Sequence, residues 1–308
     1  MVMLIHRFSV PESILRRWWG ITPLRIGVFR ASCDVSHGTS AGERKKQTGN
    51  TIMLIQAKTL KGFKLGSLDG NIGGVSDFYF DDHRWVIRYL VADTGGWLTG
   101  RSVLISPYAL IAAHKDQGNI EINLTKDQIK NSPSPDCDKP VSRQFEKEYN
   151  GYYGWPSYWG GPSTWGAYPM PVSDPQLYVS NIIDSTESHD PHLRSTDEVT
   201  GYHLQASDGE IGHVVDFIID DQTWAIRYLV VDTNNWWPSK NILVSPGWIK
   251  RVSWTDEKVF IDLTRDAIKA APAYKSDELI SRSYENSLFQ HYGASDYWSL
   301  ELEEQSTR

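Results

Sequence analysis

One segment of this sequence occurs twice, and that duplication constrains the fold more than any other feature. The segment beginning Asp69-Gly70 returns 139 positions later, beginning Asp208-Gly209. The second copy preserves short groups of residues at the same offset: Ile211-Gly212, Asp216-Phe217, Asp220-Asp221, Trp224, Ile226-Arg227-Tyr228-Leu229-Val230 and Asp232-Thr233. A constant offset with no gap indicates a duplicated structural unit rather than chance similarity.

The repeated segment has the pattern of a β-hairpin. Two strand-like runs flank a short polar turn that begins at Asp81-Asp82. In the first run Phe78 and Phe80 share one face, and their counterparts are Phe217 and Ile219, so we assign this face to the core. The opposite face carries Val75, Asp77 and Tyr79 in the first unit and Asp216 in the second, so we expect it to contact solvent or a partner. The second run, Trp85–Asp93, is apolar on both faces except at Arg88, which predicts a central strand covered on both sides.

The rest of each unit predicts more short strands and then helices. Ser102–Ser106, Tyr108–Ala113 and Asn119–Leu124 have strand patterns separated by turn residues. Thr125 and Gln128 have the spacing of a capping box. Beyond it, apolar residues four apart predict one helix face, namely Val141, Phe145 and Tyr149 in the first unit and Ile280, Tyr284 and Leu288 in the second. The predicted fold is mainly β: two tandem small antiparallel β-barrels, each followed by short helices.

We expect the two units to pack as a pseudo-twofold pair, because a unit of roughly 95 residues buries only a modest core by itself. The predicted boundaries are 53–154 for the first repeat and 199–293 for the second. An aromatic, Pro- and Gly-rich linker at 155–198 joins them, and its first part is expected to pack on a barrel. An acidic tail covers 294–308. Residues 1–52 are interpreted as a disordered or mis-assigned extension upstream of a native start at Met53, with a basic membrane anchor as the alternative.

Composition argues against several classes of function. The net charge of −7 and the pI of about 5.7 give no support to nucleic-acid binding, because an acidic surface repels phosphate. The sequence has no apolar run of 18 residues, so we expect no stable membrane insertion. The two cysteines, Cys33 and Cys137, lack the spacing of a metal site or a disulfide framework. A cytoplasmic location, or one peripheral to an inner membrane, fits these properties.

The repeated motifs resemble the PRC-barrel domain of bacterial proteins. The resemblance is carried by Asp-Gly-x-Ile-Gly-x-Val-x-Asp-Phe, Asp-Asp-x-x-Trp-x-Ile-Arg-Tyr-Leu-Val and Asp-Thr, and it covers both units. Lys139–Arg143 and Tyr152–Pro156 are similar to the stand-alone two-repeat members. This fold is shared by the cytoplasmic part of the photosynthetic reaction centre H subunit and by the C-terminal half of a ribosome maturation factor. The resemblance implies a pair of β-barrels that works through protein contacts, and it does not imply catalysis.

Several polar groups are candidates for a catalytic or metal site. The pairs Asp81-Asp82 and Asp220-Asp221 are interpreted as turn-forming residues, because neighbouring side chains on a strand point to opposite faces and converge poorly on a substrate. Arg88 and Arg227 are interpreted as structural and are expected to pair with Asp77 and Asp216. His189 and His192 lie in the polar linker beside a proline, which argues against a metal site. We therefore predict no catalytic residue, no cofactor and no metal.

The best candidates for a contact surface are tryptophans. Trp97 in the first unit and Trp236 and Trp237 in the second follow the predicted central strand, in a loop of the kind that anchors interfaces, although each can also pack on its own barrel. Trp155, Tyr158 and Trp159 in the linker are the second choice.

The predicted function is non-enzymatic, through contact with an unknown protein partner or with a second copy, and no small-molecule substrate is expected. One alternative is a role like that of the reaction centre H subunit, supporting electron transfer at a membrane. Another is a metal-dependent hydrolase that uses the aspartate pairs.

Overall fold

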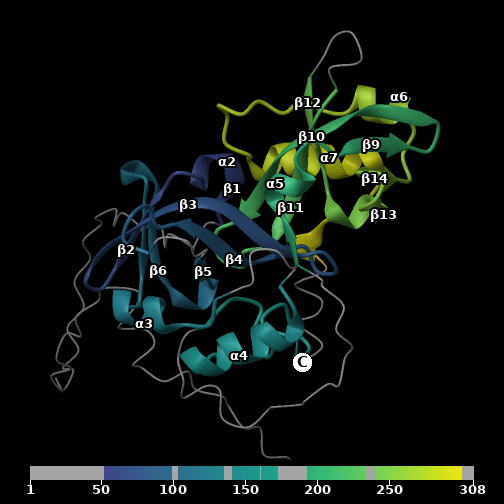
Figure 1. Cartoon of the computed structure of the whole chain (residues 1–308). Coiled ribbons are helices and arrows are strands. Elements are labelled where there is room, and N and C mark those ends of the chain that lie inside the picture. The colour runs from purple at the N-terminus through teal and green to yellow at the C-terminus, as the bar shows by residue number, and fades with distance from the viewer. Residues whose placement is uncertain are drawn as a thin grey trace, which may run out of the picture. The chain divides into compact units, whose positions relative to one another are not determined.

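Two β-sheets of seven strands each form the core of the described structure (Figure 1). The computed structural model describes residues 52–98, 103–134, 141–159, 161–172, 193–233 and 240–299. The mainly β prediction is confirmed, and the two sheets have the same order of elements.

The first repeat is built from seven strands and short helices. Its elements are β1 (Leu54–Gln56), α2 (Ala57–Leu60), β2 (Lys64–Ser67), β3 (Gly70–Asp81), β4 (Val86–Asp93), β5 (Val103–Ile105), η1 (Pro107–Ala109), β6 (Leu110–His114), η2 (Lys115–Gln117), β7 (Asn119–Ile122), α3 (Lys126–Asn131) and α4 (Arg143–Tyr153).

The second repeat follows the same order, and most of its boundaries lie 139 positions after those of the first. Its elements are β8 (Leu193–Ser195), α5 (Thr196–Val199), β9 (His203–Ala206), β10 (Gly209–Asp220), β11 (Ile226–Asp232), β12 (Asn241–Val244), η4 (Pro246–Trp248), β13 (Ile249–Ser253), β14 (Lys258–Ile261), α6 (Arg265–Ala270) and α7 (Arg282–Tyr292).

Within each repeat, six strands form one continuous path. The order is β5-β4-β3-β2-β7-β6 in the first repeat and β12-β11-β10-β9-β14-β13 in the second. Neighbours are antiparallel except for one parallel pair in each sheet, β2 with β7 and β9 with β14, which the prediction of an antiparallel barrel did not include. No pairing among the described residues joins the two ends of either path, so each sheet is open rather than a closed ring.

The seventh strand of each sheet comes from the other repeat. β1 pairs with β10, where Ile55 lies opposite Ile219, and β8 pairs with β3, where Arg194 lies opposite Phe80. The exchange is reciprocal, as expected of the predicted pseudo-twofold pair. It also corrects the linker prediction, because β8 and the start of α5 fall inside 155–198. No pattern in the sequence predicts β8, since a strand of three residues is too short to show periodicity.

The predicted core face is confirmed, with one local correction. Phe78, Phe80, Phe217 and Ile219 are all buried. Val75 is buried as well, although alternation placed it on the opposite face with Asp77. The register shifts between Val75 and Asp77, which marks a β-bulge, and a bulge moves the residues beyond it to the other face.

Helix α3 begins at the capping residue that the sequence predicts. Thr125 and Gln128 make the expected capping box at the start of α3. In α4, Phe145 stacks on the buried Tyr149, and Val141 lies in the same apolar cluster. The first part of the predicted linker packs on the first repeat as expected, with Tyr158 and Trp165 buried in the core.

Candidate functional site

A buried arginine lies at the end of the central hairpin in each repeat. Arg88 on β4 is 1% exposed and donates to Asp81 Oδ2 at 3.1 Å. Arg227 on β11 donates to Asp220 Oδ2 through Nε at 3.0 Å and Nη2 at 2.7 Å. The other oxygen of each aspartate accepts from two backbone N–H groups of the turn, as predicted for turn-forming residues. Burial by itself raises the pKa of Asp81, but Arg88 and the turn N–H groups outweigh it and hold this pKa below its usual value.

The expected partners of these arginines were wrong. Register explains why: Asp81 lies opposite Val86, which makes Arg88 its diagonal neighbour two positions along the same face. Asp77 lies opposite Val91, three positions from Arg88, and so faces the other way.

Asp77 and Asp216 instead connect the two repeats. Asp77 accepts hydrogen bonds from Ser195 Oγ at 2.5 Å and Thr196 Oγ1 at 2.7 Å, at the start of α5. Asp216 accepts from Lys58 N at 3.0 Å, at the start of α2. Each carboxylate therefore binds the start of the first helix of the other repeat. The partner predicted for the strand face that carries these aspartates is the other repeat of the same chain.

Aromatic rings cover the guanidinium groups. Arg88 Cζ lies 3.7 Å from the centre of the Tyr158 ring and 4.7 Å from that of Trp165. Arg227 Cζ lies 4.1 Å from the centre of the Tyr297 ring. Such cation–π contacts stabilise a charge that burial would otherwise destabilise.

A buried glutamate supports each covering tyrosine. Glu146 on α4 accepts from Tyr158 at 2.8 Å and Tyr89 at 3.2 Å, and it pairs with Arg143 at 3.0 Å. Burial raises the pKa of Glu146 to about 7, against the opposing effects of Arg143 and of the hydrogen bonds. In the second repeat Glu285 makes the equivalent contacts with Tyr297, Tyr228 and Arg282 at 3.0, 2.8 and 2.9 Å.

Sequence reasoning missed both glutamates and Tyr297, and it named Tyr158 only as a candidate for a protein contact, although a signal for this arrangement was present. The 139-residue offset extends past the predicted ends of the repeats, so that Tyr158-Trp159 in the linker recurs as Tyr297-Trp298 in the tail. The linker and the tail therefore begin as copies of one piece, which covers the arginine in both repeats.

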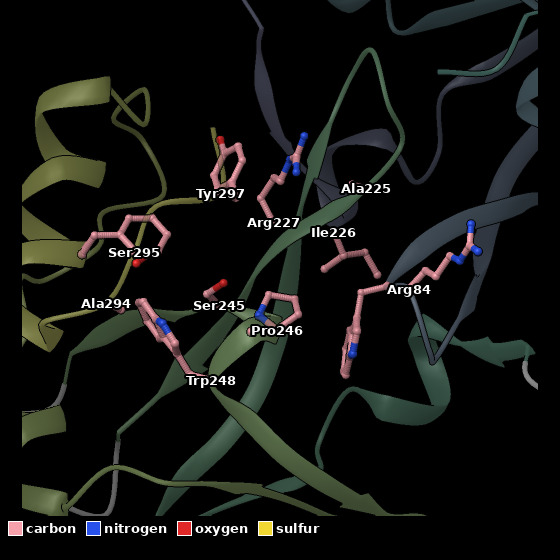
Figure 2. A pocket seen from close by; sticks show the side chains of 13 residues that line it. Arg84, Ala225, Ile226, Arg227, Ser245, Pro246, Trp248, Ala294, Ser295 and Tyr297 are labelled. Carbon is pink, nitrogen blue, oxygen red and sulfur yellow. The ribbon is translucent and has the colours of Figure 1, made fainter. Parts of the chain in front are cut away.

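A cavity of about 370 Å³ opens beside Arg227 (Figure 2). This volume is at the lower end of the roughly 300–1,000 Å³ range of ligand pockets. Arg84 lies on the side opposite Trp248 and Tyr297. The lining combines apolar and aromatic side chains with two arginines and three hydroxyl groups, and includes Arg84, Ile226, Arg227, Ser245, Trp248, Ser295 and Tyr297.

Of the tryptophans predicted as contacts, the three that the structure describes, Trp97, Trp155 and Trp159, do not line this cavity. Trp97 is half-buried and its Nε1 donates to the Ile72 carbonyl at 2.8 Å. Trp155 stacks on Tyr153 with ring centres 4.4 Å apart, and Trp159 lies under Arg143. Trp236 and Trp237 lie outside the described residues, as do His189 and His192. A contact role for these tryptophans stays a prediction.

The described residues contain neither a membrane-spanning helix nor a cluster of metal ligands. None of the helices in this part of the chain is long and apolar enough to cross a membrane. No group of three or more His, Cys, Asp or Glu side chains within the same residues could hold a metal ion.

Comparison with known proteins identifies the second repeat. Residues 198–268, from α5 to α6, match the family model of the PRC-barrel domain. This segment is a PRC-barrel domain. A similar protein is an uncharacterized protein of Deinococcus radiodurans, 38% identical over 73 residues, which are 23% of this chain. The chain spans about a quarter of that relative's length (26%). The matched PRC-barrel segment includes both Asp220 and Arg227, and the first repeat has the same order of elements around Asp81 and Arg88.

Proposed function

We propose that this chain is a non-enzymatic binding protein, and that the cavity beside Arg227 in its PRC-barrel domain receives part of a protein partner. The observation that carries the proposal is the open cavity itself, which has aromatic and aliphatic walls and two arginines. Aromatic residues and arginine are enriched at the centres of protein interfaces.

The polar groups of the cavity favour binding over catalysis. A guanidinium stays protonated and can donate hydrogen bonds to carbonyl or carboxylate oxygens, but it is a poor general base. The carboxylate that pairs with Arg227 is already engaged, because Asp220 accepts two hydrogen bonds from Arg227 and two from the turn. The alternatives of a reaction-centre-like role and of a metal-dependent hydrolase stay predictions without a contact of their own to support them among the described residues.

Site-specific photo-crosslinking in cells of the source tests the proposal. A benzophenone amino acid replaces Ser295, which is exposed and lines the cavity, or Lys250, which is exposed on β13 and does not line it. We expect a covalent adduct with another polypeptide from position 295 and none from position 250. Absence of an adduct at 295, or equal adducts at both positions, would contradict a contact site at the cavity.

A further inference from the structure

In the first repeat, a side chain of the same protein fills the position that corresponds to the cavity beside Arg227. Subtracting 139 from the residues that line the cavity gives their counterparts: Arg227 corresponds to Arg88, Ser245 to Ser106 and Tyr297 to Tyr158. Each site also includes one residue from the other repeat, and these two residues follow the same offset, since Arg84 corresponds to Thr223. Of these counterparts, Arg88 and Tyr158 contact the side chain of Trp165, as does the Thr223 carbonyl.

Trp165 is 1% exposed, and its contacts define the chemistry of this place. Its ring lies 4.7 Å from Arg88 Cζ and meets Tyr108 edge-on at 5.0 Å. Its Nε1 donates to the Thr223 carbonyl at 2.7 Å. The preceding carbonyl, of Thr164, accepts from Arg88 Nη1 at 2.8 Å. The Trp165 indole thus donates to the Thr223 carbonyl, and the Thr164 carbonyl accepts from the Arg88 guanidinium.

A tight turn presents Trp165. Ser163 N donates to the Gly166 carbonyl and Trp165 N to the Tyr168 carbonyl, both at 2.8 Å. Gly166 has a φ of +75°, and a Cβ at that position would lie 3.1 Å from the Ser157 carbonyl oxygen. The glycine after the tryptophan is therefore part of what makes the turn possible.

The second repeat has no such tryptophan of its own. The residue 139 positions after Trp165 is Glu304, and the last tryptophan of the chain is Trp298. Tyr108, which meets Trp165, is replaced by Gly247, and Trp155, which lies against Tyr108, is replaced by Ala294. Trp248 supplies one ring to the lining. The second site thus keeps the arginine and the covering tyrosine, and has room for an aromatic ring.

We infer that the cavity beside Arg227 receives a tryptophan side chain, presented on a Trp-Gly turn of a partner protein. The inference rests on the proposed function and names the chemistry of the partner. The indole packs against Arg227 and Trp248, and its N–H donates to the Arg84 carbonyl, which is the counterpart of the Thr223 carbonyl. The first repeat carries the internal version of the same complex.

A peptide with the sequence of residues 160–168 (Gly-Gly-Pro-Ser-Thr-Trp-Gly-Ala-Tyr) is the probe, titrated into the ¹⁵N-labelled full chain. We expect saturable NMR shifts at Ala225, Ser245 and Gly247, with one site per chain. The same peptide with Trp165→Ala should cause none. In the protein, Trp248→Ala should weaken binding about tenfold or more. Trp254→Ala, which removes another half-buried tryptophan of this repeat, should leave it unchanged.

A second variant keeps the test independent of the folding of Trp248→Ala. Trp165→Ala in the full chain vacates the first site, and the peptide should then shift resonances in both repeats with two sites per chain. Shifts that are absent at millimolar peptide, or equal for both peptides, overturn the inference.

The photo-crosslink separates the two proposals. If the adduct from position 295 is a partner segment without tryptophan, or a second copy of this chain, the inference fails and the contact site stands. If no adduct forms, the proposed function fails.

Discussion

Val86 and Ala225 lie opposite each other in an antiparallel β-bridge, and they occupy the same position in the two repeats. The flanking hydrogen bonds are reciprocal: Ile87 N donates to the Trp224 carbonyl at 2.8 Å, and Ile226 N donates to the Trp85 carbonyl at 2.7 Å. The two repeats are therefore joined by backbone pairing at equivalent positions, and not only by the linker.

The Val86–Ala225 bridge predicts an engineered disulfide. The donors are the flanking residues, so Val86 and Ala225 form a non-hydrogen-bonded pair, whose Cα atoms are about 4.5 Å apart in antiparallel sheets. That distance lies within the range that disulfides span. In a Cys33→Ser, Cys137→Ser background, Val86→Cys with Ala225→Cys should form an intramolecular disulfide on mild oxidation, detected by intact mass and by peptide mapping. Either cysteine alone is the control. A folded double variant that stays reduced would contradict this register.

Two glycines of the repeated motif should not tolerate alanine. Gly73 and Gly212 have φ values of +130° and +149°, and a Cβ would lie 1.9 Å from the Asp93 carbonyl oxygen and 2.1 Å from that of Asp232. Gly73→Ala and Gly212→Ala should each lower the free energy of unfolding by at least about 2 kcal/mol, measured by urea denaturation. Gly96→Ala is the control, because its Cβ would meet nothing within 4 Å. Equal stability of all three variants would contradict the close approach.

Removing the partner of a buried arginine should be costly. Asp81→Asn leaves Arg88 buried without its carboxylate, and we expect the free energy of unfolding to fall by about 3–5 kcal/mol. The double variant Asp81→Leu, Arg88→Met should recover part of this loss, because it removes both charges. Asp127→Asn on the exposed side of α3 should change stability by less than about 0.5 kcal/mol. Chemical denaturation of the variants checks the order, and an Asp81→Asn chain as stable as the Asp127→Asn chain would refute it.

Glu146 should make stability depend on pH near neutrality. Burial raises the pKa of Glu146 from 4.5 to about 7, so between these values the folded chain holds a proton that the unfolded chain has released. The free energy of unfolding therefore falls as pH rises from 4.5 to 7, by on the order of 3 kcal/mol from this residue. Glu146→Gln removes that contribution.

Urea denaturation of both chains at several pH values measures the difference in stability. The Glu146→Gln chain should gain stability relative to the wild type as pH rises through this interval, with no further relative change above it. Parallel pH profiles would show that Glu146 is ionised throughout.

The candidate site could be predicted only in part from the sequence. The hairpin aspartates were recognised as turn residues, and Arg88 and Arg227 as buried groups in need of a partner. The choice of Asp77 and Asp216 was wrong because the register of β3 against β4 contains bulges that alternation does not reveal. The hydroxyls of Tyr89 and Tyr158 both donate to the Glu146 carboxylate. Glu146 lies 57 positions and Tyr158 lies 69 positions after Tyr89, and no local pattern predicts contacts over such separations.

The order of residues alone predicts the duplication, the hairpin, the core face at Phe78 and Phe80 and the capped helices, because each depends on periodicity, turn residues or capping over a few neighbouring positions. The exchange of β1 and β8, the burial of Trp165 and the cavity beside Arg227 are visible only in the folded chain. These depend on which distant segments meet, and the energies of such contacts are set by packing and burial rather than by the order of nearby residues.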